Sequence, residues 1–122
     1  LMYVRANDAD GAGWPYWNPV LLDTLASEPS LCVVDGYPAI AYVGDSGQEM
    51  RYVRALDVAG IVWSDPQTLD RLEGDVFAYP SITSIDGMPS VGYHFEIGTP
   101  AGVRFARVSE LTADIDWIAV EP

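Results

Sequence analysis

The chain has 122 residues, enough for one domain, and 49% of them are apolar, as in a folded globular protein rather than a disordered one. It carries 18 acidic residues against six basic ones, all arginine, so the formal net charge at pH 7 is −12. This balance excludes a nucleic-acid partner and an anionic membrane surface, because both need basic patches. We expect the acidic surface to serve solubility.

The sequence also speaks against metal sites, cofactors and disulfides. The single cysteine, Cys32, lies among apolar neighbours, which predicts a buried and unreactive thiol. The single histidine, His94, is expected to be a packing residue, and one His with one Cys cannot build a zinc site. The acidic run at Asp8 lacks the rest of a calcium-loop spacing and is better explained as a turn. We expect no metal and no cofactor.

Membrane and export signals are not evident in the given sequence. It has no basic and apolar leader at its start, and its apolar runs are too short to span a membrane. We therefore expect no membrane partner, and a cytoplasmic location is favoured over an exported one.

In chain order, the sequence alternates short β-favouring runs with turns rich in Gly, Asp, Asn and Pro. No segment shows convincing helical periodicity, and residues 24–29 and 71–78 are expected to be connections. The dipeptides Asp35-Gly36 and Asp86-Gly87 are strong signals of two-residue β-hairpins. We predict an all-β fold of ten short antiparallel strands, at residues 1–6, 14–23, 30–34, 37–43, 49–56, 61–69, 81–85, 88–95, 103–108 and 115–120.

The chain contains an internal repeat. Residues 3–6 (Tyr-Val-Arg-Ala) recur at 52–55, and Asp8, Gly11 and Trp14 recur 49 positions later as Asp57, Gly60 and Trp63. The hairpin at 30–43 recurs 51 positions later. Repeats of this length with four strands each are typical of propeller blades. We therefore predict a single domain, 1–122, of about 2.5 blades: a half blade at 1–23 and full blades at 29–70 and 80–121.

The turns at 6–14 and 55–63 resemble the Asp-box, Ser/Thr-x-Asp-x-Gly-x-x-Trp, which marks blade hairpins in sialidase-like and other BNR-repeat propellers. Here alanine replaces Ser/Thr, and one extra residue separates Asp from Gly. The resemblance implies structural roles. Asp8 and Asp57 would accept backbone N–H bonds, Gly11 and Gly60 would adopt positive φ, and Trp63 would cap the blade. The last repeat is degenerate: it keeps Trp117 but has Glu110 in place of Asp.

Because closed propellers have about 4–8 blades, this chain supplies too few to close a ring. A four-stranded blade cannot bury both its apolar faces alone, so neighbouring blades must stack on it. We predict a homo-oligomer, with a dimer as the simplest symmetry, that completes the ring. Excision from a longer protein, or a smaller open β structure, are the alternatives.

Five arginines occupy repeated positions: Arg5, Arg54 and Arg107 in one set, Arg51 and Arg104 in another. Resemblance to sialidases would imply an arginine cluster that grips a substrate carboxylate, a Tyr/Glu nucleophile pair and an acid/base Asp. A catalytic cluster needs unlike residues that converge, so we expect the repeated arginines to pair with repeated carboxylates between blades.

The candidate binding residues are aromatic and basic. Trp14, Tyr16 and Trp17 crowd one loop, where aromatic rings can stack on a sugar or anchor a protein, and Arg54 and Arg107 join them. The favoured hypothesis is a non-catalytic binding or scaffold module with a carbohydrate or protein ligand. The alternatives are a sialidase-like glycoside hydrolase, or a fragment of one, and a small stand-alone β domain.

Overall fold

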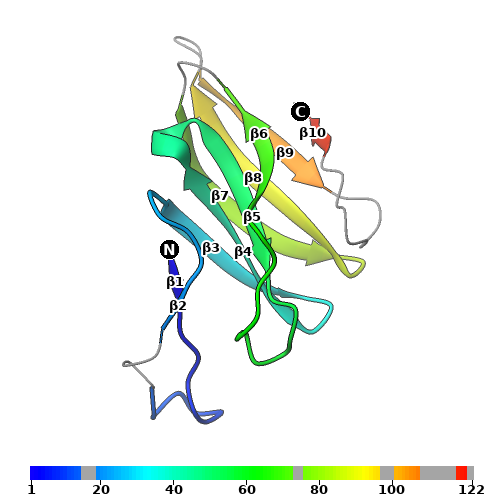
Figure 1. The fold of residues 1–122 in the computed structure, drawn as a ribbon. Helices are drawn as coiled ribbons and strands as arrows, with labels where there is room; N and C mark the ends of the chain where they lie inside the picture. The colour runs from blue at the N-terminus through cyan, green and yellow to red at the C-terminus, as the bar shows by residue number, and fades with distance from the viewer. Residues whose placement is uncertain (15–18, 73–75, 97–100, 108–117, 121–122) are drawn as a thin grey trace.

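A computed structural model describes residues 1–14, 19–72, 76–96, 101–107 and 118–120. In these residues the fold contains no α-helix, and its strands form three antiparallel sheets, which confirms the predicted all-β class (Figure 1). One 3-10 turn, η1 (Asp45–Gly47), lies between two strands. The strands are β1 (Met2–Tyr3), β2 (Val20–Leu21), β3 (Ser27–Val34), β4 (Tyr37–Gly44), β5 (Glu49–Arg54), β6 (Gln67–Arg71), β7 (Val76–Ile85), β8 (Met88–Glu96), β9 (Ala101–Arg107) and β10 (Ile118–Val120).

Two of the sheets have four strands and the same topology. The middle sheet has the order β3-β4-β5-β6, and the last sheet runs from β7 through β8 and β9 to β10. Both begin with a predicted hairpin. Asp35 and Gly36 have φ of 49° and 84°, and Asp86 and Gly87 have φ of 52° and 77°. Two consecutive positive φ angles make a type I′ turn, whose twist matches that of the flanking strands, so both Asp-Gly predictions are confirmed.

The first sheet contains only β1 and β2, with Met2 opposite Leu21 and Tyr3 opposite Val20. By the sequence repeat, β1 corresponds to β5 and β2 to β6. β1 and β2 have two residues each, so the strands predicted at 1–6 and 14–23 are much shorter in the structure than expected. Residues 15–18 lie outside the described residues.

The predicted connections at 24–29 and 71–78 are partly wrong, because the first strand of each four-stranded sheet begins earlier than expected. β3 starts at Ser27 and β7 at Val76. Each strand passes through a register shift at a residue with left-handed backbone, Glu28 or Tyr79, both at φ 52°, directly before a proline. This bulge lets the strand continue past the proline that the sequence suggested as its beginning.

The predicted strand at 61–69 is also shifted. β6 begins at Gln67, directly after Pro66, which has no N–H to give to a ladder. Upstream of it, Trp63 makes an isolated bridge with Ala55. The predicted strand at 103–108 begins instead at Ala101. Only Ile118–Val120 of the predicted strand at 115–120 is described as a strand, and Trp117 lies outside the described residues.

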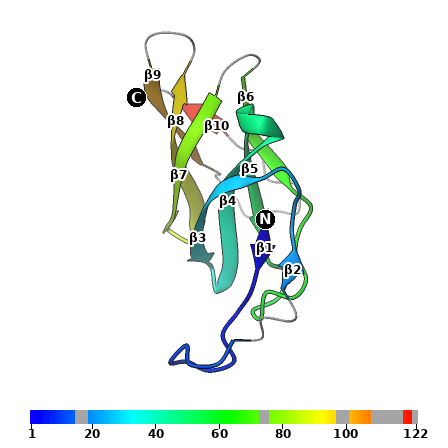
Figure 2. The same ribbon diagram turned by 90° about the vertical axis from the view of Figure 1, so that its left-hand side faces the viewer.

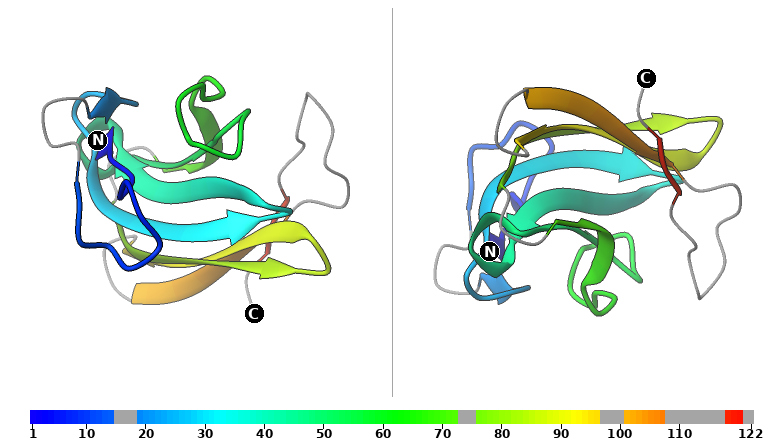
Figure 3. Two further views of the ribbon diagram at one scale, coloured as in Figure 1. Left: turned by 90° about the horizontal axis from the view of Figure 1, so that it is seen from below. Right: turned by 90° about the horizontal axis from the view of Figure 1, so that it is seen from above.

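The middle and last sheets stack face to face, as the views from below and above show (Figure 3). Between them lies the larger core. From the middle sheet it takes Val34, Ala39, Ala41, Val43, Met50, Tyr52 and Leu69, and from the last sheet Phe77, Ile82, Val91, Tyr93 and Ala106. The opposite face of the middle sheet carries a smaller core of Ile40, Tyr42 and Val53, covered by Leu1, Tyr3 and Leu22 of the first unit. The middle sheet is therefore covered on both faces.

The two junctions use equivalent residues. Ile40 lies opposite Val53 in the middle sheet, and Val91 lies opposite Ala106 in the last sheet. The first pair faces the first unit, and the second pair faces the middle sheet. Each sheet thus presents the same side to the unit before it, and the sequence repeat is a repeat of stacked sheet units.

Candidate functional site

The turn after β5 is held by one carboxylate. Asp57 accepts hydrogen bonds from the backbone N–H groups of Ile61 (3.0 Å) and Val62 (2.8 Å). Gly60 has φ 73°, and its carbonyl accepts a 2.8 Å bond from the indole N–H of Trp63. The backbone hydrogen bonds from Ile61 and Val62 hold the pKa of Asp57 below its usual range. Aspartate, glycine and tryptophan therefore act as one unit that fixes the turn.

The turn after β1 repeats this geometry. Asp8 accepts from the backbone N–H groups of Ala12 (2.9 Å) and Gly13 (3.0 Å). Gly11 has φ 70°, and its carbonyl accepts a 2.8 Å bond from the Trp14 indole. The backbone bonds to Asp8 and Asp57 and the positive φ of Gly11 and Gly60 are the ones that the sequence predicts. The capping of a blade by Trp63 stays a prediction.

The two turns differ in what covers them. The Tyr3 ring lies 4.9 Å from the Trp63 ring, edge to face, and packs directly over Gly60. Nothing lies within 4 Å of the position that a Cβ on Gly11 would take, and Trp14 is 46% exposed. Tyr3 belongs to the first unit and Gly60 to the next, so the second turn is covered by a tyrosine from the unit before it. Among the described residues, the first turn has no such cover.

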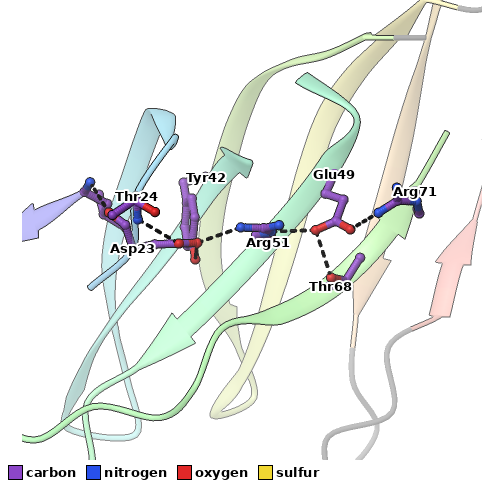
Figure 4. A network of polar contacts seen from close by, with 8 residues as sticks. Asp23, Thr24, Tyr42, Glu49, Arg51, Thr68 and Arg71 are labelled. Atoms are coloured by element: carbon purple, nitrogen blue, oxygen red, sulfur yellow. Dashed lines mark hydrogen bonds and ion pairs between the residues drawn. The ribbon is translucent and has the colours of Figure 1, made fainter. Parts of the chain in front are cut away.

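A second repeated feature, a set of side-chain hydrogen bonds, joins the sheet units; Figure 4 shows its first copy. Asp23, two residues after the end of β2, accepts a 2.7 Å hydrogen bond from the Tyr42 hydroxyl and a 2.8 Å bond from the Arg51 guanidinium on the same Oδ2. Thr24 adds a backbone N–H bond of 2.8 Å to Oδ1. We call the Asp23, Tyr42 and Arg51 contact the first lock. It ties the first unit to the middle sheet.

The same contact recurs at the next junction. Asp70 on β6 accepts a 2.7 Å bond from the Tyr93 hydroxyl and a 3.0 Å bond from Arg104, again on one oxygen. Asp70 and Arg104 are 11% and 16% exposed in their side chains, so the pair is largely shielded from water. This second lock ties the middle sheet to the last. Charge-assisted bonds in such surroundings are stronger than surface ion pairs.

In the first lock, ionisation is coupled to packing. Burial raises the pKa of Asp23, but hydrogen bonds from Tyr42 and Arg51 outweigh it and hold the pKa below its usual range. Burial and the hydrogen bond to Asp23 raise the pKa of Tyr42 far above its ordinary value. The carboxylate is therefore charged and the phenol neutral at any ordinary pH.

The first lock extends into a longer network through Glu49, whose equivalent in the last sheet is Gly102. The Arg51 Nε donates to Glu49 at 2.5 Å, and Thr68 donates to the same oxygen at 3.2 Å (Figure 4). Arg71 binds the other Glu49 oxygen and also lies 3.2 Å from Asp45. Although burial raises the pKa of Glu49, the bond from Arg51 outweighs it, and the net shift is downward.

The predicted pairing of arginines with carboxylates between units is confirmed for Arg51 and Arg104 and is wrong for Arg5 and Arg54. Arg5 donates to the carbonyl of Val58 at 2.7 Å, across the unit boundary. Arg54 donates to the carbonyl of Val34 at 3.1 Å and lies over the Tyr37 ring at 4.8 Å. Each of these two guanidinium groups binds a backbone carbonyl instead, and the buried Nε of Arg54 has no hydrogen-bond partner among the described residues.

The predicted binding residues lie on separate elements. Trp14 is in the first turn, Arg54 at the end of β5 in the middle sheet, and Arg107 at the end of β9 in the last sheet. Tyr16 and Trp17 lie outside the described residues. Sequence reasoning missed Asp23, Asp70, Tyr42 and Tyr93 as one functional set. The available signal was that all four recur at equivalent places in the repeat.

A groove of about 360 Å³ lies at the boundary between the first unit and the Asp57 turn. Its walls come from Tyr3, Val4, Arg5 and Asn7 on one side and from residues 59–61 on the other. Arg5 and Asn7 are the polar residues of a lining that is otherwise mostly apolar. Such a mixture suits a small polar ligand with an apolar face.

The remaining candidates are structural. Cys32 is half-buried, and burial raises the pKa of its thiol, in line with an unreactive cysteine. The His94 ring lies 6.1 Å from that of Tyr79. Among the described residues, no cluster of His, Cys, Asp or Glu could hold a metal ion. In the same residues, no helix is long and apolar enough to cross a membrane.

Comparison of the chain with protein-family models, with curated proteins and with solved structures finds no match.

Proposed function

We propose that the chain is a non-catalytic binding or scaffold module of propeller type, in which each sheet unit is one blade. The observation that supports it most is the repeated lock. Asp23 meets Tyr42 and Arg51 at one junction, and Asp70 meets its own tyrosine and arginine at the next. A contact repeated between successive sheets fixes a constant step from one unit to the next, as a stacked repeat requires.

The exposed end of the stack supports self-association. Met50, opposite Val43 on the covered face of the middle sheet, is fully buried. Its counterpart on the last sheet is Val103, opposite His94, and it is 56% exposed. A face that is buried inside the repeat is thus open at its end, which favours a homo-oligomer and, most simply, a dimer.

The groove beside the Asp57 turn is the proposed ligand site, for a carbohydrate or a protein segment. Tyr3 offers an aromatic ring, and Arg5 and Asn7 offer hydrogen-bond donors. A sialidase-like hydrolase is less favoured, because Asp23 and Asp70 already engage Arg51 and Arg104, two of the arginines that could grip a substrate carboxylate.

Light scattering after size exclusion tests the proposal, with an expected mass of twice one chain. Val103→Glu should reduce it to one chain without loss of the β-sheet circular dichroism, while Leu25→Glu, an exposed residue between β2 and β3, should leave it unchanged. A monomeric original chain would refute self-association. Turnover of a fluorogenic sialoside by the purified chain, abolished when Arg104 is replaced, would refute the non-catalytic assignment.

A further inference from the structure

The first unit has half the strands of the others. Its strand β1 corresponds to β5 and β9, and each of these is paired on both edges, β5 with β4 and β6, and β9 with β8 and β10. In the described part of the chain, β1 pairs only with β2. Among the described residues, the edge of this two-residue strand that faces away from β2 is therefore unpaired, and an unpaired edge can accept a further strand.

The apolar face beside this edge is also uncovered. Leu31 lies opposite Ile40 in the middle sheet, as Ile82 lies opposite Val91 in the last sheet, so Leu31 and Ile82 hold equivalent positions. Ile82 is 7% exposed, whereas Leu31 is 58% exposed. Isolated exposed apolar residues are ordinary, but here the fold itself buries the equivalent residue.

The strand that covers Ile82 indicates which kind of element would cover the equivalent residue Leu31. Strand β3 lies along β7 (Figure 2). The Ser30 hydroxyl accepts a 3.1 Å bond from the Ile82 N–H. The Glu28 carboxylate accepts a 2.7 Å bond from the Tyr79 N–H. Since β3 is the first strand of the β3–β4 hairpin, the equivalent cover for Leu31 is the first strand of another such hairpin. Its second strand would lie beside the open edge of β1.

We propose that the free edge of β1, together with Leu31, is the docking site for one β-hairpin of this chain's own repeat type. The hairpin carries a serine and an acidic residue at the positions of Ser30 and Glu28, and an Asp-Gly turn. A further repeat supplies it, and not a second copy of this chain, because both hairpins of a second copy are already built into four-stranded sheets. This site is separate from the exposed face at Val103 that the proposed self-association uses.

A fusion tests the proposal. A copy of residues 27–49 is joined directly ahead of Leu1, because Leu1 corresponds to Met50 in the repeat. We expect the thermal midpoint to rise by roughly 5 °C or more, and amide hydrogen exchange in β1 to slow roughly tenfold or more. The matched control carries the same 23 residues in scrambled order. It should match the original chain in both measurements.

A substitution in the face sharpens the test. Leu31→Ser should leave the midpoint of the original chain nearly unchanged and lower that of the fusion, whereas Ile82→Ser should lower both equally. Equal behaviour of the fusion and its scrambled control overturns the proposal. So does a Leu31→Ser variant that lowers the mass of the original chain in light scattering, because a second copy would then cover the face. Failure of self-association alone leaves these readouts unaffected.

Discussion

Gly102 lies opposite Phe95 across the β8–β9 pair, and a Cβ added to Gly102 would come within 2.7 Å of the Phe95 ring. The centre of that ring is 4.5 Å from the guanidinium carbon of Arg104, the arginine of the second lock. The missing side chain at Gly102 therefore leaves room for an aromatic ring that holds the arginine in place.

The middle sheet also has a glycine beside the arginine of its lock, but the glycine is on the other strand of the pair. Gly44 on β4 lies opposite Glu49 on β5, and a Cβ on Gly44 would come within 2.6 Å of Arg51 Cδ. Here the arginine is held by the carboxylate of Glu49 at 2.5 Å instead of a ring. In both sheets one glycine of the cross-strand pair makes space, and its partner steadies the arginine of the lock.

We predict that Gly102→Ala destabilises the protein by about 1–3 kcal/mol in urea unfolding, because the Phe95 ring must move. Phe95→Leu in the same chain should recover part of the loss, since leucine lacks the ring edge that the new Cβ meets. Gly92→Ala is the control, because nothing lies within 4 Å of its Cβ position. Equal losses for the two alanine variants would contradict the prediction.

The two turn glycines form a second matched pair. Gly11 and Gly60 both have positive φ, so alanine at either should cost about 1 kcal/mol from the backbone alone. Only at Gly60 would the new Cβ also overlap the Tyr3 ring. Gly60→Ala should therefore cost roughly 1–3 kcal/mol more than Gly11→Ala. In a Tyr3→Ala background the two variants should become equal, and a difference that persists there would show that Tyr3 is not its source.

The local features of the fold could be predicted from the sequence because they depend on neighbouring residues. An Asp-Gly pair between β-favouring runs specifies a type I′ turn wherever it occurs, and Asp35-Gly36 behaves as expected. Asp57 binds residues only four and five positions ahead, so its role follows from the spacing. The strand limits were less predictable. The register shift at Glu28 carries β3 past Pro29, and residue identity alone does not show this.

The contacts between units could be predicted only in part. Repeated arginines suggested carboxylate partners, which Arg51 and Arg104 have, but Arg5 and Arg54 follow the same repeat and bind carbonyls. The difference depends on which atoms the stacking brings near each guanidinium, a tertiary property that repeat spacing does not contain. The position equivalent to Glu49 in the last sheet is Gly102, which has no carboxylate, so no repeat signal marked the Glu49 network.

The second lock should be a main determinant of stability between the middle and last sheets. Asp70→Ala removes the carboxylate that Tyr93 and Arg104 share, and we expect a loss of roughly 3 kcal/mol in urea unfolding. Asp70→Asn keeps an acceptor for the hydroxyl but not the charge, so its loss should be smaller. Asp65→Ala, at an exposed position, should change stability by less than about 0.5 kcal/mol. If Asp70→Ala proves no worse than Asp65→Ala, the lock is not a stabilising contact.

Acid should weaken the junction between the first unit and the middle sheet. The pKa values of Asp23 and Glu49 both lie below their usual range in the folded protein, through bonds that outweigh the effect of burial. A carboxyl group with a lowered folded pKa stabilises the fold above its unfolded pKa of about 4, and this stability is lost as pH falls through the folded pKa. We therefore expect the free energy of unfolding to be nearly constant from pH 7 to about 5 and to fall steadily between about pH 4 and pH 2.

Urea titrations at pH 7, 5, 4 and 3 measure this dependence, and Asp23→Asn separates the contribution of the first lock. The variant should be less stable than the original chain at pH 7, and its stability should fall less steeply below pH 4, because one proton fewer is taken up on unfolding in acid. Asp10→Asn, at an exposed position, should show the slope of the original chain. An Asp23→Asn slope identical to that of the original chain would mean that the Asp23 carboxylate does not couple protonation to the stacking of the two units.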